Sequence, residues 1–138
     1  ENIRTELPDR FDLIHHNGDP SDLIDLWLDR EVLVVDAAAA DEMTNPIRVF
    51  DPLNSPTGPA TGEVTSSHAL SLAEALELGR MLDKLPRSMT VVAIAGEDFA
   101  FGDRLTPRTQ QAVAAATQWI VTAFPQTEPG ESACTKAP

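Results

Sequence analysis

Two side chains of this sequence, Asp36 and His68, have the types and positions needed to bind a transition metal. Asp36 ends the apolar run VLVVD (32–36), and His68 follows two serines just ahead of an apolar helical pattern. Ligands of open α/β sheets bind outside the carboxyl ends of the strands, so we expect both residues at that edge. A carboxylate and an imidazole together suit nickel or zinc. The same spacing is also typical of an aspartate that caps a loop and of a solvated histidine, so both interpretations stay open.

Other patterns of catalytic residues are absent or weaker. The sequence has no H-E-x-x-H, Cys-x-x-Cys, G-x-S-x-G or G-x-x-x-x-G-K-[ST] motif. His15 and His16 would point to opposite faces of a strand, so we take His16 as a minor metal candidate and His15 as structural. Glu97 and Asp98 follow another apolar run, and for both we expect loop and cap roles.

Composition limits the classes of partner. The chain has 138 residues, of which 22 are acidic and 10 basic, so its formal net charge is -12. This charge argues against nucleic acid or an anionic membrane as a partner, because binding to phosphates needs clustered Lys and Arg. The single cysteine, Cys134, cannot form an internal disulfide, and no apolar run approaches the roughly 20 residues of a membrane span. We therefore expect a soluble cytoplasmic protein.

Apolar runs predict four strands separated by helices. The strands are expected at FDLIHH (11–16), EVLVVDA (31–37), PIRVF (46–50) and MTVVAIAG (89–96). The second and fourth are continuous enough to be buried on both faces, and the third is more peripheral. Residues 51–66 hold most of the turn formers and are expected to form a long loop.

Each predicted helix starts at a side chain that can accept hydrogen bonds from the first backbone amides. These residues are Asp19 (before Pro20), Ser71 (with Glu74 in a capping box) and Thr106 (before Pro107). The expected inward faces are Leu23, Ile24, Trp27 and Leu28; Leu72, Leu76, Gly79 and Leu82; and Val113, Thr117, Ile120 and Phe124. Alternating strands and helices predict an α/β three-layer sandwich, with a mostly parallel twisted sheet covered by helices on both faces. We expect residues 1–125 to form one domain and residues 126–138 to form a polar, disordered tail.

Three segments carry a specific combination of motifs: VVDA (34–37), SSHALSLAEALELGRMLDKLP (66–86) and VVAIAGEDFAFGDRLTPRTQQAV (91–113). They contain an aspartate at a strand end, Ser-His before a helix, and Gly-x-x-Leu-Thr-Pro before the last helix. This combination resembles the hydrogenase maturation protease family, whose members remove a C-terminal extension from the large subunit of nickel–iron hydrogenases. The resemblance runs from about residue 8 to residue 123. It implies that Asp36 and His68 are two of three metal-contacting, catalytic residues.

The sequence also departs from the family pattern. The family's third ligand is an acidic residue in a glycine loop after the first strand, and neither that strand nor that loop is present here. ENIRTELP (1–8) matches the end of the first family helix, so we expect the domain to be N-terminally incomplete, with a gap in its sheet. An aspartate that often follows the second family strand aligns with either His16 or Asp19, which are minor candidates for the missing ligand.

The resemblance implies that the nickel is carried by the substrate rather than by the free enzyme. The nickel already inserted in the large-subunit precursor would then be the signal that permits cleavage. The precursor is the expected partner, and neither nucleic acid nor a membrane is. A second hypothesis is a non-catalytic relative that binds a hydrogenase subunit or another protein without cleaving it.

Overall fold

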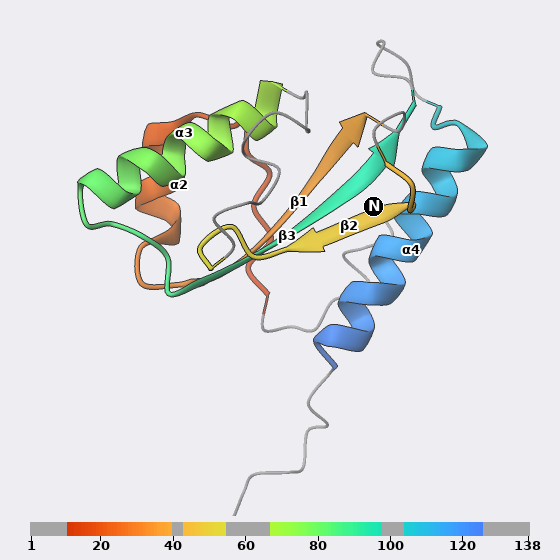
Figure 1. Ribbon diagram of the computed structural model, residues 1–138. Coiled ribbons are helices and arrows are strands. Elements are labelled where there is room, and N and C mark those ends of the chain that lie inside the picture. The colour runs from red at the N-terminus through yellow and green to blue at the C-terminus, as the bar shows by residue number, and fades with distance from the viewer. Residues whose placement is uncertain (1–10, 40–42, 55–66, 98–103, 126–138) are drawn as a thin grey trace, which may run out of the picture.

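The computed structural model describes residues 11–39, 43–54, 67–97 and 104–125, with only the backbone at 67–71. In chain order the elements are α2 (Pro20–Trp27), β1 (Glu31–Ala39), β2 (Ile47–Phe50), α3 (Ser67–Met81), β3 (Ser88–Gly96) and α4 (Pro107–Ala123) (Figure 1). The predicted α/β class is confirmed. The predicted tail 126–138 lies outside the described residues.

The described sheet has three strands in the order β1-β3-β2. β1 and β3 are parallel along their whole length, from Glu31 opposite Ser88 to Ala39 opposite Gly96. β2 is antiparallel to β3, with Ile47 opposite Ile94. The sheet is therefore mixed, whereas the sequence predicted a mostly parallel one. β2 occupies an edge of this sheet, as its short and weakly apolar sequence indicated.

Helix α4 covers one face of the sheet. Its Ala112 and Ala116 are fully buried against Val92 and Ile94 of β3, in what we call the α4 cluster. Small side chains let the helix approach the sheet closely, and Ile120 is buried one turn further along. The predicted inward face was rotated by about one residue, because the alanines rather than Val113 and Thr117 form its centre.

Helices α2 and α3 pack on the opposite side of the sheet from α4 (Figure 1). The α2–α3 cluster consists of Ile24, Trp27, Ala75, Leu76, Met89 and Val91. Trp27 is 2% exposed, and its indole Nε1 donates to the Lys84 carbonyl oxygen over 2.9 Å. Gly79 lies beneath this bond: a Cβ there would lie 3.1 Å from that oxygen. The two helices are thus joined at the end where α3 leads into β3.

The strand predicted at 11–16 is wrong, because residues 11–19 have no regular secondary structure. A strand needs a partner for its backbone groups, and none of the described strands lies opposite this segment. It is held instead by an edge-to-face contact between Phe11 and Phe124, at 5.3 Å, and by an Asp12–Arg30 ion pair at 3.7 Å. Leu13 and Ile14 remain exposed.

The prediction that β1 is buried on both faces is also wrong in part. Val35 is 42% exposed, while Val32 and Val34 pack against the α2–α3 cluster. Within the described part of the chain, β1 pairs with β3 alone. Helix α4 packs on β3 and β2 and leaves this side of β1 more open.

Candidate functional site

Asp36 lies within β1, three residues before the strand ends at Ala39. Side chains alternate along a strand, so Asp36 shares its face with Val32 and Val34, which pack on the α2–α3 cluster. In register it is opposite Ala93 of β3, and Ala93 is in turn opposite Arg48 of β2. One row across the sheet therefore carries an acid, a small apolar residue and a base, all on the α2–α3 face.

The Asp36 side chain is half-buried and makes a local hydrogen bond. The backbone N–H of Ala37 donates to Asp36 Oδ1 over 2.9 Å. An ionised carboxylate has two oxygens and about four acceptor positions, so the bond from the Ala37 N–H does not by itself exclude metal contact. The bond also means that Asp36 has a structural role in its strand, as a capping aspartate would.

His68 is the second residue of α3, because that helix begins at Ser67. The predicted start at Ser71, with His68 in a loop, is therefore wrong by one turn. Ser71 lies inside the helix, where its backbone amide belongs to the i→i−4 pattern. The structure describes the backbone of His68 and not its side chain.

The chain path brings the positions of Asp36 and His68 to the same end of the sheet. α3 leads through residues 82–87 into β3, where the N–H of Arg87 donates to the Arg30 carbonyl over 2.8 Å beside the start of β1. The last turn of α3 therefore lies near the amino ends of the strands. Its 15 residues extend about 22 Å back toward the carboxyl ends. Leu72, one turn after His68, packs on the same cluster as Val34.

Figure 1 shows the first turn of α3 on the α2–α3 side of the sheet, toward the end at which the arrowhead of β1 lies. This placement rests on the backbone and on the packing of their neighbours. The predicted metal contact between the two side chains stays a prediction. Among the described side chains, no three His, Cys, Asp or Glu residues are grouped closely enough to hold a metal ion.

His16 has its ring engaged in a local turn. The N–H of Gly18 donates to His16 Nδ1 over 2.8 Å. Because Nδ1 is the acceptor, the proton of the neutral ring lies on Nε2, and neither nitrogen offers a lone pair to a metal in this conformation. Gly18 has a φ of 89°, which favours glycine at this turn. His16 is therefore a weaker metal candidate than its sequence position indicated.

Asp19 is the N-cap of α2, as predicted. Its Oδ1 accepts from the N–H groups of Ser21 at 2.9 Å and Asp22 at 3.4 Å. Pro20 occupies the first helical position, where no N–H is needed. The carboxylate of Asp19 is thus committed to the helix, and this also weakens it as a metal candidate.

Glu97 has the structural role that the sequence predicted. Its Oε2 accepts from the Thr106 hydroxyl at 2.7 Å, and Oε1 pairs with Arg108 at 3.3 Å. Thr106 Oγ1 in turn accepts from the N–H of Thr109 at 3.2 Å, so it is the N-cap of α4. Asp98 lies outside the described residues.

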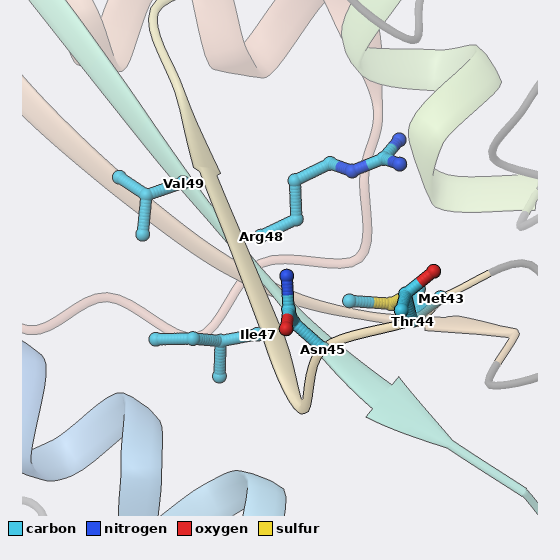
Figure 2. Close-up of a pocket in the computed structure, with 6 residues that line it drawn as sticks. All are labelled: Met43, Thr44, Asn45, Ile47, Arg48 and Val49. Carbon is cyan, nitrogen blue, oxygen red and sulfur yellow. The ribbon is translucent and has the colours of Figure 1, made fainter.

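Arg48 and the cavity that it lines were not predicted from the sequence. This cavity, of about 330 Å³, is lined by Met43, Thr44, Asn45, Ile47, Arg48 and Val49 (Figure 2). No local signal distinguishes Arg48 from other surface arginines. Its place in the row of Asp36 follows only from the antiparallel register of β2.

One carboxyl outside this row has a shifted pKa. The side chain of Asn54 donates to Asp51 Oδ2 over 2.7 Å, and the N–H groups of Leu53 and Asn54 donate to Oδ1. These bonds favour the charged form and hold the pKa of Asp51 below its ordinary value. Asp51 begins the turn after β2, so its bonds terminate that strand.

No protein-family model and no curated protein matches the sequence. Among solved structures, the chain is similar to an endopeptidase from Escherichia coli, with a TM-score of 0.68 and 21% identity over 85% of this chain and 72% of the other. It is similar to the hydrogenase maturating endopeptidase HybD from E. coli, also with a TM-score of 0.68 and 21% identity, over 88% and 78%. The NiFe hydrogenase maturation protease HybD from Thermococcus kodakarensis matches with a TM-score of 0.54 and 17% identity, over 80% and 69%.

None of the helices in the described part of the chain is long and apolar enough to cross a membrane.

The similar structures cover most of the chain and agree with the resemblance that the sequence motifs indicated. The protein therefore has the fold of the hydrogenase maturation endopeptidases.

Proposed function

We propose that this protein is an endopeptidase that removes the C-terminal extension of a nickel–iron hydrogenase large-subunit precursor. The observation that carries the proposal is the likeness of the fold to hydrogenase maturation endopeptidases. The presence of Asp36 near the end of β1 and of His68 at the start of α3 supports it. The proposed location is the cytoplasm, and the proposed partner is the precursor itself.

The proposed role of Asp36 and His68 is to contact nickel that arrives in the precursor. The ion belongs to the substrate, so the protein needs only part of its coordination shell. Imidazole and carboxylate ligands both occur in nickel sites. The Ala37 N–H bond fixes Asp36 Oδ1, and a fixed ligand loses less conformational freedom when it binds. A precursor without nickel would lack this anchor, and its tail would be retained.

The test is cleavage of nickel-loaded precursor by wild-type protein and by His68→Ala, followed by mass spectrometry of the tail. Loss of a metal contact should slow cleavage by about 100-fold or more, because losing even a residue that only hydrogen-bonds to a metal ligand costs about 10–100-fold. His15→Ala is the matched control, because His15 is an exposed histidine that carries no proposed role. It should cleave at the wild-type rate.

The outcomes separate the two hypotheses. Normal cleavage by a folded His68→Ala protein would contradict the proposed site. Nickel-dependent binding of the precursor without cleavage by the wild type would instead support the non-catalytic relative. Wild-type cleavage of nickel-free precursor at the same rate would contradict the role of the ion as signal.

A further inference from the structure

We propose that the cavity beside β2 receives an extended segment of the precursor, which pairs with β2 as an additional strand. This inference rests on the proposed function and names the surface that would hold the substrate chain near Asp36. Extended peptides commonly add to exposed sheet edges, where backbone hydrogen bonds supply affinity and side-chain pockets supply specificity.

The cavity borders β2, the edge strand of the described sheet. Arg48 projects from one side of the strand, and Ile47 and Val49 project from the other (Figure 2). All three residues line the cavity, so it borders β2 along most of this short strand. The inner edge is occupied by β3, with which β2 pairs from Ile47 to Phe50.

The hydrogen-bond pattern shows which backbone groups face this cavity. The N–H of Ala95 donates to the Pro46 carbonyl over 3.0 Å, and this bond flanks the facing residues Ile47 and Ile94. Bonded and non-bonded pairs alternate along an antiparallel ladder, so Arg48 bonds inward and Ile47 and Val49 point their N–H and C=O groups outward. Among the described residues, no strand lies opposite this outer edge.

The polar side chains of the cavity suit a peptide, and its position suits the proposed site. Thr44, Asn45 and Arg48 supply a hydroxyl, an amide and a guanidinium. Arg48 lies two strands from Asp36 in the same row, which separates their Cα atoms by about 10 Å. A peptide that leaves the groove at Ile47 therefore emerges at the carboxyl ends of β1 and β3, which is the end nearer to Asp36.

Charge favours the precursor over a second copy of this chain as the occupant. A second copy would bring another formal charge of -12 to the same edge, and like net charges oppose association. A backbone segment in the groove brings little charge of its own, so it meets no such opposition.

The first test compares Val49→Pro with Val49→Ala in cleavage of nickel-loaded precursor. Proline removes the outward N–H of residue 49 and leaves the inward bonds of Arg48 in place, a position where edge strands tolerate proline. Alanine removes the side chain and keeps the N–H. We expect Val49→Pro to raise KM by about tenfold with little change in kcat, and Val49→Ala to remain near wild type.

The second test is hydrogen exchange of the wild-type protein, with and without a synthetic peptide of the precursor's C-terminal extension and the residues before it. The amides of Ile47 and Val49 should be protected by about tenfold, while the amide of Arg48, already in the ladder, should not change. This measurement needs no folded variant. Protection of the Arg48 amide instead, or of neither outward amide, would contradict the proposed pairing of a precursor segment with β2.

These tests distinguish the two proposals. If the wild type cleaves the precursor and Val49→Pro cleaves it with an unchanged KM, the groove is wrong and the endopeptidase function stands. If the wild type does not cleave the precursor, the proposed endopeptidase function is wrong. Protection of the outward amides by the peptide is then the remaining test of the proposed pairing with β2. Protection that rises with protein concentration in the absence of peptide would identify a second copy as the occupant and overturn the proposal.

Discussion

Asp36 and Glu97 are acids near the carboxyl ends of two neighbouring parallel strands, yet their surroundings differ. Glu97 is bound to the start of α4 through Thr106 and Arg108. Asp36 lies on the other face, under the α2–α3 side, in a row with Ala93 and Arg48. The comparison shows that acids near the ends of neighbouring strands can meet different surroundings, a helix N-terminus for Glu97 and a row with Ala93 and Arg48 for Asp36.

The largest expected effect is on cleavage. Asp36→Asn should keep the bond from the Ala37 N–H, because the amide oxygen also accepts, but it removes the charge that would contact nickel. We expect cleavage to fall by about 100-fold or more with little change in the melting temperature. Glu97→Gln is the matched control and should cleave normally. An equal loss of cleavage in both variants would contradict the proposal that Asp36 and Glu97 have different roles.

The next effect is on the layer that lies over the Asp36 face. Trp27→Phe keeps much of the ring but removes the donor to the Lys84 carbonyl. A buried acceptor that loses its partner costs about 1–3 kcal/mol, so the free energy of unfolding in urea should fall by that amount. Ile24→Val, in the same cluster, is a control for a small loss of packing. Equal stability of Trp27→Phe and wild type would show that the bond does not hold α2 to α3.

A smaller effect is expected on the Glu97 side. Thr106→Ala removes the N-cap of α4 and one partner of Glu97 together, which should cost about 1 kcal/mol of stability. Thr106→Ser keeps the hydroxyl and should restore most of this loss. Because these residues form a cap and not a site, the rate of cleavage by the folded protein should not change in either variant. A specific loss of cleavage would assign Glu97 to the site after all.

The smallest effect concerns Asp51, a third acid at a strand end. Its pKa is held below the ordinary 3.8, first by the side chain of Asn54 and then by backbone N–H groups. A lowered folded pKa gives stability that is present above the unfolded pKa and is lost as the pH falls through the folded one. Urea unfolding between pH 6 and pH 3 should therefore show a slightly steeper loss for wild type than for Asn54→Ala. Parallel curves would show that this bond does not favour the charged form.

The sequence by itself determined the elements whose signals are local. Asp19 before Pro20 and Thr106 before Pro107 fix the starts of α2 and α4, because a cap needs only amides within the next three residues. The apolar runs of β1 and β3 were found for the same reason. The motifs around Asp36 and His68 also indicated the fold that the similar structures share.

Only the tertiary structure decided which backbone groups find partners. Residues 11–16 have the composition of a strand, but pairing depends on a neighbour that their sequence does not specify. The register of β2 is equally non-local, and it alone puts Arg48 in the row of Asp36 and directs the amides of Ile47 and Val49 outward. A one-residue slip would move Arg48 to the opposite face. The candidate site was therefore predicted at Asp36 and His68, while Arg48 and the cavity beside it depend on strand pairing between residues 45 positions apart along the chain.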